Sequence, residues 1–577
     1  MANLIYLCGP ASRSYTDDDL RRVAARITPE NAPSETRIVR DGDTAMCLVG
    51  DAGVVPVRGT SVCMGQILDQ TAEWAEPGTP APEGTYAIVR DDAETVELCS
   101  DIVGSRSLYY RLFEDLFVAA TSQRAVMHFA DAVEFEPRTV PWMVASGTLG
   151  HHQAWDGRVE LLPPDSRLRL DRSAWECSVE RSRPSFSDGN GQPRHEARLG
   201  AALGGSCNGF DIDTSEWVLP LSGGVDSRAL LLEYRDADGL ETVTWGTADA
   251  PADPDNDAAV ARDVAAACDV PHSYYELPTA PDDVETVFER FLTAGEGRID
   301  HVGGYVDGFE TFSSLAQRGV SGIIRGDVAQ SQTVVKSPDH VRVNVGARLL
   351  SDYADLASVS VPAGDQQAWP DRFGRRTGES LSTWRDRVYQ QYRIPYVLAP
   401  LSDLKLPYLE IVNPLLTHRS VEAFRELPDE ARTGKRLFGD YVRTNGPDVR
   451  IAESGAVPGY ADIFGASGTV EYLHRSIDTD RARSLLGTEL VEWTLDAMGE
   501  RSEAGAGTAP SAAEWSSATD AVKYAVANTL PSSVTSLVAA HTPVEPPKIT
   551  VDPNHLAFRL YLVVSMVERL ERDTEAL

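Results

Sequence analysis

The stretch WVLPLSGGVDSRALLL, residues 217–232, decides the fold. Its apolar run at 217–221 predicts a buried strand, and residues 228–234 predict the start of a helix. Two adjacent glycines in the turn between them let the backbone approach a polyphosphate with no Cβ in the way. The amides of such a turn and the helix dipole attract anions. The stretch therefore predicts a strand, a phosphate-binding loop and a helix.

The polar side chains of this loop suit the same ligand. Ser222 and Ser227 can donate hydroxyl hydrogen bonds to phosphate oxygens. Asp226 alone would repel phosphate, so its natural role is to hold Mg²⁺ against the phosphate oxygens. No Gly-Lys-Ser/Thr follows, so this is not a Walker A loop. A Gly-Gly turn is common between a strand and a helix, but the full pattern Ser-Gly-Gly-x-Asp-Ser is far more specific and favours a functional loop.

The rest of the chain divides into three patterns. Strands are predicted downstream at 242–245, 272–277 and 320–325, alternating with helices at 258–268 and 309–318. This rhythm predicts an α/β class with a parallel sheet, helices on both faces, and ligands at the carboxyl ends of the strands. The last third is expected to be mostly helical. A loose loop is predicted there at 500–513. An apolar helix is predicted at 556–570, and its pattern indicates a core or docking helix.

The first 195 residues look β-rich. Short apolar or alternating runs predict strands at 4–7, 45–49, 84–90, 95–99, 116–120 and 167–170. A Pro/Ser/Asp/Gly-rich segment at 183–193 predicts a linker. We therefore expect two domains, residues 1–195 and 196–577.

Composition excludes several functions. The chain has 577 residues, with 87 acidic and 53 basic side chains and a formal net charge of -34. A field of that sign repels nucleic acid and anionic membrane, so neither is an expected partner. No apolar run reaches the roughly 18 residues of a spanning helix, and the start lacks a signal peptide's basic region, which predicts a cytoplasmic protein. Seven scattered cysteines without a CxxC argue against a disulfide scaffold or zinc ribbon.

The loop at 222–227 resembles the SGGxDS loop of the N-type ATP pyrophosphatases. Over nearly its whole length, the chain is similar to the asparagine synthetase B family. Residues 84–89, 101–110 and 117–122 resemble the core of that family's glutaminase domain, and 161–164 resemble its inter-domain turn. Residues 412–416 and 433–437 are looser matches. The resemblance implies an Ntn-hydrolase-like, class II amidotransferase-like α+β domain. A PP-loop synthetase domain of the adenine-nucleotide α-hydrolase type, with a helical C-terminal part, would follow it.

The resemblance also implies a chemistry, that of a carbon–nitrogen ligase which serves asparagine biosynthesis and uses ATP and Mg²⁺. A carboxylate attacks the α-phosphorus of ATP, Mg-pyrophosphate leaves, and an amine captures the acyl adenylate to give an amide. The residue pattern agrees, because pyrophosphate release needs a dry, cationic cradle that carries the metal.

The resemblance assigns roles to single residues. Ser222, Gly223, Gly224, Val225, Asp226 and Ser227 match the pyrophosphate loop, with Asp226 as the metal ligand. Leu221 and Gly246 fall where the family holds adenine, although Gly246 is equally an ordinary turn glycine. Asp257 reads better as an acid stabilised by the next helix's dipole.

Lys435 and Asp327 are the predicted catalytic residues. Lys435 is one of only five lysines, and a lysine kept in an arginine-rich chain suggests a need for a compact point charge. The matching family lysine stabilises the negative charge of adenylation and amide formation. A surface lysine after a glycine is the alternative, and we favour the functional role. Asp327 matches the family's first acid and is a candidate general base or orienting carboxylate.

Two departures from the family alter the expected activity. Gln330 stands where the second, Mg²⁺-binding acid is expected, with Ser331 next to it. Either Asp226, the phosphates and water hold the metal, or the site is altered. Position 2 is Ala2, where family glutaminases carry a Cys nucleophile. Cys8-Gly9 would substitute only after removal of seven residues, and it does not match the register. We expect the first domain not to hydrolyse glutamine.

Several functions therefore remain open. Ammonia or a substrate amine would supply the nitrogen, and the carboxylate belongs to a small molecule or a peptide. Relatives without the Cys include β-lactam synthetase and the lasso peptide cyclases, so ring closure of a peptide or modified amino acid is an alternative. A non-catalytic nucleotide-binding regulator is another. A tRNA-modifying ATP pyrophosphatase is disfavoured by the anionic surface. The oligomeric state is open, a homodimer included.

The charge balance generates the first prediction. Only five of the 53 basic residues are lysine, and an acidic surface of this kind suits a salt-rich, halophilic cytoplasm where counterions screen self-repulsion. The thermal unfolding midpoint, followed by circular dichroism, should rise between dilute buffer and molar KCl. A midpoint that stays constant or falls would contradict the halophilic origin.

Overall fold

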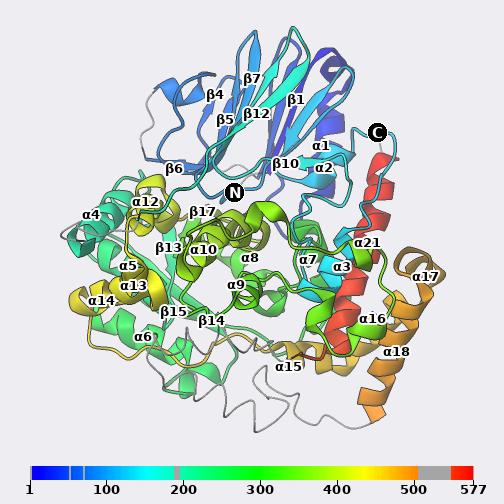
Figure 1. The fold of residues 1–577 in the computed structure, drawn as a ribbon. Helices are drawn as coiled ribbons and strands as arrows, with labels where there is room; N and C mark the ends of the chain where they lie inside the picture. Colours follow the sequence, from blue (N-terminus) through cyan, green and yellow to red (C-terminus); the bar gives the residue numbers. More distant parts are fainter. Residues whose placement is uncertain (1–2, 51–52, 69–71, 188–194, 504–547, 576–577) are drawn as a thin grey trace.

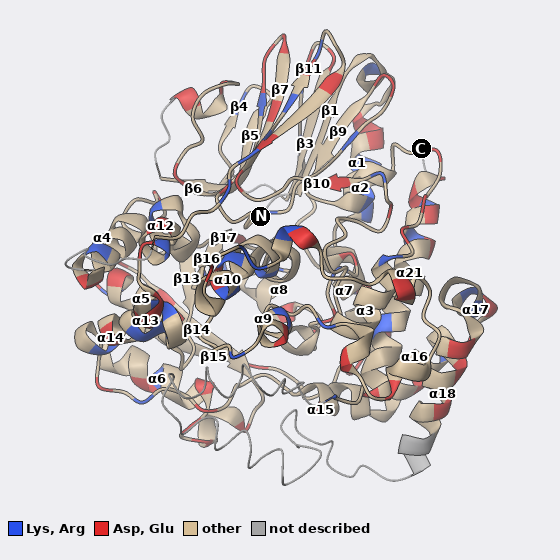
Figure 2. Ribbon diagram, in the orientation of Figure 1, with Lys and Arg blue, Asp and Glu red and all other residues tan. Residues whose placement is uncertain are grey.

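The computed structural model describes residues 3–50, 53–68, 72–187, 195–503 and 548–575. The fold is mixed α/β, with two antiparallel sheets of six strands each and one parallel sheet of five. The antiparallel sheets form one end of the molecule, while the parallel sheet and most helices form the rest (Figure 1). Acidic side chains are spread over both parts, including the outer helices α17 (Asp480–Leu486) and α18 (Thr488–Glu503) (Figure 2).

Two stacked antiparallel sheets dominate the described residues between 3 and 187, which confirms the predicted β-rich half. The first sheet has the order β10-β8-β9-β1-β3-β2 and the second β12-β11-β7-β6-β5-β4. The strands of the first sheet are β1 (Asn3–Cys8), β2 (Thr36–Asp41), β3 (Thr44–Val49), β8 (Tyr109–Leu112), β9 (Phe117–Ala120) and β10 (Glu160–Leu161). Those of the second are β4 (Val57–Arg58), β5 (Ser61–Ile67), β6 (Gly84–Asp91), β7 (Thr95–Ser100), β11 (Ser166–Asp171) and β12 (Glu176–Arg181).

Alternation along each strand explains why the sheets stack. Tyr6 and Met46 of the first sheet share a buried core with Met64 and Val89 of the second. Ile5 and its alternate neighbours on β1 point the other way, toward helix α1 (Asp17–Arg26). Successive side chains of a strand leave opposite faces, so one apolar strand serves two cores.

The parallel sheet has the order β15-β14-β13-β16-β17. Its strands are β13 (Trp217–Pro220), β14 (Glu241–Gly246), β15 (His272–Glu276), β16 (Gly322–Ile324) and β17 (Glu410–Val412). The chain lays down β13, β14 and β15 in one direction and then restarts on the other side of β13 with β16. In sheets of this kind ligands bind beyond the carboxyl ends of the strands where the order reverses, here between β13 and β16.

Helices cover both faces of this sheet, as predicted. Val218, Val243 and Ile323 share a core with α7 (Val284–Gly295) and α8 (Glu310–Gln317). Leu219 and Ile324, on the opposite face, pack in a second core. That core includes α4 (His195–Cys207), α5 (Val225–Tyr234), α6 (Asp257–Ala267), α12 (His418–Arg425) and α14 (Arg436–Asn445).

The remaining helices connect these layers. They are α2 (Gln123–Met127), α3 (Thr139–Ser146), α9 (Pro338–Asn344), α10 (Leu381–Val388), α11 (Ala399–Asp403), α13 (Asp429–Arg432), α15 (Tyr460–Gly465), α16 (Ser467–Ile477) and α21 (Pro553–Thr574). A π-helical segment, Tyr389–Leu398, joins α10 to α11. The expected loop at 500–513 is wrong at its start, because residues 500–503 continue α18 and extending a formed helix is inexpensive. Residues 504–513 lie outside the described chain.

The start of the predicted linker is docked on the helices. Ser187 N donates to Arg425 O at 3.3 Å, and Arg376 Nη1 donates to Pro184 O at 3.1 Å. Phe186 lies beneath the guanidinium groups of Arg425 and Arg432, with 5.9 and 5.0 Å to the ring centroid. Residues 184–187 are therefore attached to the C-terminal half by both hydrogen bonds and cation–π contacts.

Helix α21 is the core helix that the sequence predicted. It packs against α2 and α3 on one side and α16 and α18 on another. Phe558 lies 4.8 Å from Phe288 of α7 between ring centroids, and Leu562 is fully buried. Within the described chain, no helix combines the length and apolar character that crossing a membrane requires.

Burial of α21 gives a prediction about stability. Leu562→Ala should lower the free energy of unfolding by about 2–5 kcal/mol, because it removes a buried side chain and leaves a cavity. Glu568→Ala on the exposed face of the same helix is the control and should change it by no more than about 0.5 kcal/mol. Urea unfolding in molar KCl measures both. If Leu562→Ala changed the free energy of unfolding as little as the control does, α21 would not contribute to the core.

Candidate functional site

The predicted phosphate loop forms the connection from β13 to α5. Leu221 N donates to Val243 O at 2.8 Å and so continues the sheet. Ser222 N donates to Ser227 Oγ at 3.0 Å, and the two hydroxyls lie 3.1 Å apart. Gly224 is the N-cap of α5, and glycine has no side chain to cap the first amides. These amides are therefore left to water or to an anion at the helix N-terminus.

The side chains of the other predicted loop residues differ in their exposure. Leu221 points into the core beneath the sheet and is buried there, so its side chain does not line an open nucleotide site. Val225 is the first residue of α5 and is half-buried. The loop can thus contact a ligand through backbone groups and hydroxyls, while Leu221 acts through its main chain.

Asp257 belongs to this site, although the sequence favoured a plain helix-terminal acid. Its Oδ1 accepts a hydrogen bond from Gly223 N at 2.9 Å. Asn256, not Asp257, caps α6 by accepting from Ala258 N. Burial raises the pKa of Asp257, and the bond from Gly223 opposes that shift. The carboxylate of Asp257 thus accepts a hydrogen bond from a loop amide, as a phosphate oxygen would.

Lys435 and Asp226 meet although 209 residues separate them. Lys435 Nζ lies 2.8 Å from Asp226 Oδ1 and 2.6 Å from Oδ2, and the lysine is only 9% exposed. Burial raises the pKa of Asp226, an effect that Lys435 opposes and Asp327 reinforces. Lys435 is therefore not a surface lysine: its point charge lies on the predicted phosphate loop.

Asp327 lies beside this pair at the end of the neighbouring strand. Its Oδ2 is 2.6 Å from Arg325 Nε and 3.2 Å from Asn413 Nδ2. A Cβ on Gly326 would lie 3.2 Å from the backbone carbonyl carbon of Asp226, so the loops after β13 and β16 touch. Arg325 and Asn413 fix the direction of the carboxylate, as an orienting acid requires.

A segment that the sequence did not single out covers the loop. We call residues 449–456 the strap. Arg228 Nη1 donates to Val449 O at 2.6 Å, and Ala452 N donates to Gly223 O at 3.2 Å. Further along, Asp257 N donates to Ser454 O at 2.9 Å. The strap contains no periodic apolar pattern, so only its long-range contacts reveal it.

Two glycines of the site are required by the strap. A Cβ at Gly223 would lie 2.2 Å from the Cβ of Ala452, and a Cβ at Gly246 would lie 2.3 Å from Ala456 O. Thr247 N also donates to Ala456 O at 2.9 Å. The close backbone approach of the strap is enough to explain a glycine at position 246, which the sequence left between a nucleotide contact and a turn.

The donor set does not fit a resident Mg²⁺ ion. In the ranges that the structure describes, no group of three or more His, Cys, Asp or Glu side chains could hold a metal. Both oxygens of Asp226 are engaged by Lys435. Gln330 is 1% exposed, and neither its Oε1 nor its Nε2 has a hydrogen-bond partner among the described residues. A single carboxylate that is already paired with Lys435 is a weak ligand set for Mg²⁺.

The β-rich half offers no thiol nucleophile at Cys8. Cys8 pairs with Thr44 and Phe117 in the first sheet and is fully buried. Burial raises the pKa of its thiol to about 12, whereas nucleophilic cysteines have a lowered pKa. In the unprocessed chain Cys8 is therefore not a reactive thiol, and a nucleophile exposed by removal of residues 1–7 stays a hypothesis. Ala2 lies outside the described residues.

A narrow cavity extends from Asp327 toward the β-rich half. Thr85, Ser105 and Arg106 line it from that half, and Asp327 and Asn413 line it from the parallel-sheet side. Arg106 pairs with Glu410 and donates to Ile411 O at 2.6 Å. The two halves of the molecule are thus joined by a buried guanidinium close to the candidate site.

Comparison with known proteins adds little to this geometry. No protein-family model and no curated protein matches the chain. Among solved structures it is similar to glutamine phosphoribosylpyrophosphate amidotransferase from B. subtilis complexed with ADP and GMP, with 11% identity and a TM-score of 0.19. That match covers 42% of this chain and 65% of the other.

A second solved structure, the allosteric regulatory enzyme of purine biosynthesis, has the same identity, TM-score and 42% coverage of this chain, and covers 64% of the other. The chain thus spans just under two thirds of the length of each. At this TM-score the likeness supports no conclusion about fold or activity.

The strap contacts generate a prediction about the loop. Gly223→Ala should lower the free energy of unfolding by about 1–3 kcal/mol, because its methyl would collide with Ala452. Gly224→Ala is the matched control, since its Cβ would meet only Ser222 Oγ at 3.4 Å and should change stability by less than about 1 kcal/mol. Urea unfolding measures the difference, and hydrogen exchange should show faster exchange of the Ala452 amide in Gly223→Ala alone. Indistinguishable variants would mean that the strap does not rest on Gly223.

Proposed function

We propose that the chain is an ATP-dependent, AMP-forming amide synthetase of the asparagine synthetase type. The observation that carries the proposal is the arrival of Lys435 on Asp226, in the phosphate loop at the point where the strand order reverses. Adenylation requires groups that bind and neutralise phosphate, and groups that move a proton. The buried cation, the first amides of α5 and the second oriented carboxylate at this strand end would supply them.

The loop residues would bind the polyphosphate of MgATP. The hydroxyls of Ser222 and Ser227 would donate to phosphate oxygens. The amide of Gly223 would do so by exchanging Asp257 Oδ1 for a phosphate oxygen, and the amide of Gly224 by exchanging Ser222 Oγ. Lys435 would exchange its contact with Asp226 for the phosphates, where its charge offsets the charge that develops as pyrophosphate leaves. Held beforehand in position, such a charge stabilises the transition state without reorganisation.

Asp327 would act on the incoming amine. Its carboxylate is held by Arg325 and Asn413 next to Asp226, within the same strand-end site. From there it would orient the amine and accept its proton as the amide bond forms. The amine is ammonia or part of the substrate, and in the second case the product is a ring, as in a β-lactam synthetase or a lasso peptide cyclase.

The proposal assigns residues 1–195 to an inactive Ntn-hydrolase-like domain and residues 196–577 to a PP-loop synthetase domain. Two stacked antiparallel sheets with helix α1 on one outer face support the first assignment. The five-stranded parallel sheet with its strand-end loop supports the second. Ala2 and the buried thiol of Cys8 leave glutamine without a nucleophile, so nitrogen would not come from this domain.

A second candidate is a regulatory protein that binds a nucleotide without turnover. Gln330 in place of an acid and the engagement of both Asp226 oxygens by Lys435 favour it. The two candidates differ in one property: only the synthetase releases pyrophosphate when a carboxylate is present.

Pyrophosphate release tests the proposal directly. In molar KCl with MgATP, wild type should release pyrophosphate only when a suitable carboxylate is added, with aspartate and short peptides as the first candidates. Lys435→Ala should lower this rate by about 10²–10³-fold, because it removes a charge aimed at the developing anion. Lys548→Ala, at an exposed lysine, is the control and should keep the wild-type rate.

ATP binding measured by calorimetry separates the two candidates. Wild-type binding together with absent release for every carboxylate would favour the regulator. Failure to bind ATP at all would contradict both.

A further inference from the structure

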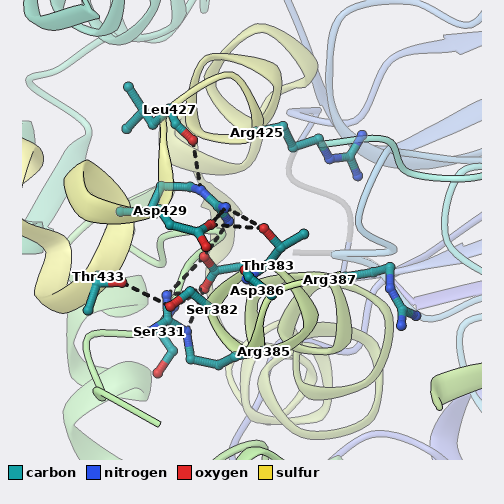
Figure 3. Close-up of polar contacts among 12 residues, drawn as sticks. Ser331, Ser382, Thr383, Arg385, Asp386, Arg387, Arg425, Leu427, Asp429 and Thr433 are labelled. Carbon is teal, nitrogen blue, oxygen red and sulfur yellow. Dashed lines mark hydrogen bonds and ion pairs between the residues drawn. The ribbon is translucent and has the colours of Figure 1, made fainter. Parts of the chain in front are cut away.

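A buried cluster of charges lies next to Thr433, at the start of the turn that contains Lys435 (Figure 3). We call Arg385, Asp386 and Arg432 the Asp386 cluster. Asp386 is fully buried on α10 and accepts from Arg385 Nε and Nη2, both at 2.9 Å. Arg432 Nη1, from α13, donates to Asp386 Oδ2 at 2.7 Å. One carboxylate thus holds two guanidinium groups from different helices.

One arm of the cluster reaches the lysine loop. Arg432 lies three residues before Lys435, and its Nε donates to Leu427 O at 2.9 Å while Nη2 donates to Thr383 Oγ1 at 2.7 Å. Thr433 Oγ1 is 3.1 Å from Ser382 Oγ of α10. Contacts of Arg432 and Thr433 with α10 therefore fix the start of the turn that contains Lys435.

The other arm reaches the loop that follows Asp327. Ser331 N donates to Asp386 Oδ1 at 3.4 Å, and Arg385 Nη1 donates to Thr333 O at 2.7 Å. Ser331 also donates to Asn344 of α9 at 2.8 Å. Asp386 consequently accepts one hydrogen bond from Arg432, in the segment before Lys435, and one from Ser331, in the segment after Asp327.

The lysine turn needs such external support. Gly434 and Lys435 both have left-handed backbone angles, with φ of 67° and 52°. A non-glycine residue in this conformation is disfavoured and persists where the surroundings enforce it. Arg432, which is 1% exposed and donates to Asp386 and Thr383, directly precedes this turn.

Stability alone does not account for these buried ions. Removing two guanidinium groups and a carboxylate from water is costly, and apolar replacements of buried ion clusters are often neutral or stabilising. The best attested use of buried ions is to specify one arrangement among several.

We infer that Asp386 is a positioning residue, which sets Lys435 and the Asp327–Ser331 loop at a fixed separation around the phosphate loop. The role of that separation in adenylation rests on the proposed function. The position of Lys435 itself does not, and it can be measured without turnover.

The test replaces the whole cluster by apolar side chains, in Arg385→Met/Asp386→Leu/Arg432→Met. Its unfolding midpoint should match or exceed that of wild type. The kcat of pyrophosphate release should fall at least tenfold, with the KM for ATP changed less than threefold. A purely structural role would lower stability and activity together.

A matched control lies on the same helix. Arg387 is equally buried, and its hydrogen-bond partners in the described part of the chain are Glu379, Gln391 and Gly374, none of which belongs to either site loop. Arg387→Met/Glu379→Leu should therefore keep the wild-type kcat.

Lysine labelling supplies the readout that is independent of activity. Lys435 is buried against Asp226, so a succinimidyl ester followed by mass spectrometry should label it slowly in wild type and at least fivefold faster in the triple variant. Lys548 serves as the internal reference. If wild type releases no pyrophosphate, the proposed function fails while the labelling result still decides the inference.

Unchanged labelling of Lys435 in a folded triple variant would overturn the inference, as would equal loss of kcat in the Arg387 control. Should the triple variant not fold, Asp386→Asn carries the same two readouts. It keeps the shape of the side chain while removing its charge.

Discussion

The candidate site depends on the close contact between the loops that leave β13 and β16. Gly326 lies against the backbone of Asp226, and a Cβ there would be 3.2 Å from two of its main-chain atoms. Because the strand order reverses at this point, no crossover helix intervenes between the two loops. The phosphate loop and Asp327 are therefore neighbours by topology. Lys435, Asn413 and the strap are added to that pair from later parts of the chain.

Charge is arranged differently at the site and at the surface. The chain has a net charge of -34, yet Arg228, Arg325, Arg432 and Lys435 gather around one strand end and are buried or half-buried there. Each has a partner, either a carboxylate or a backbone carbonyl. Because each cation is paired, no buried charge is left without a partner when the site is empty. An anion that displaces one of these partners would bind a cation that has already lost its water. On the proposed function, this local arrangement would let an acidic protein attract an anionic nucleotide.

The sequence predicted what local pattern and turn chemistry control. Strand periodicity placed β13, β14 and β16, and the glycine pair located the phosphate loop, since both signals lie within a few residues. The strap and the Asp386 cluster left no such signal, because their contacts join residues far apart, such as Ser331 with Asp386. Gly246 is a further example. The sequence shows that position 246 is a glycine, but the contact that excludes a side chain there comes from Ala456, 210 residues later. Lys435 was located through the resemblance of residues 433–437 to the family, and its rarity as one of five lysines supported that assignment.

The pairing of Lys435 with Asp226 explains why a lysine suits this position. A compact ammonium contacts both carboxylate oxygens at once and can turn to another anion by rotating about a flexible stem. A guanidinium would lock the carboxylate in a planar, two-point contact. On the proposed function, the phosphates would take over the contact that Lys435 makes with Asp226, so the lysine would be paired in both states. Exchange of one anionic partner for another avoids the large cost of leaving a buried cation unpaired.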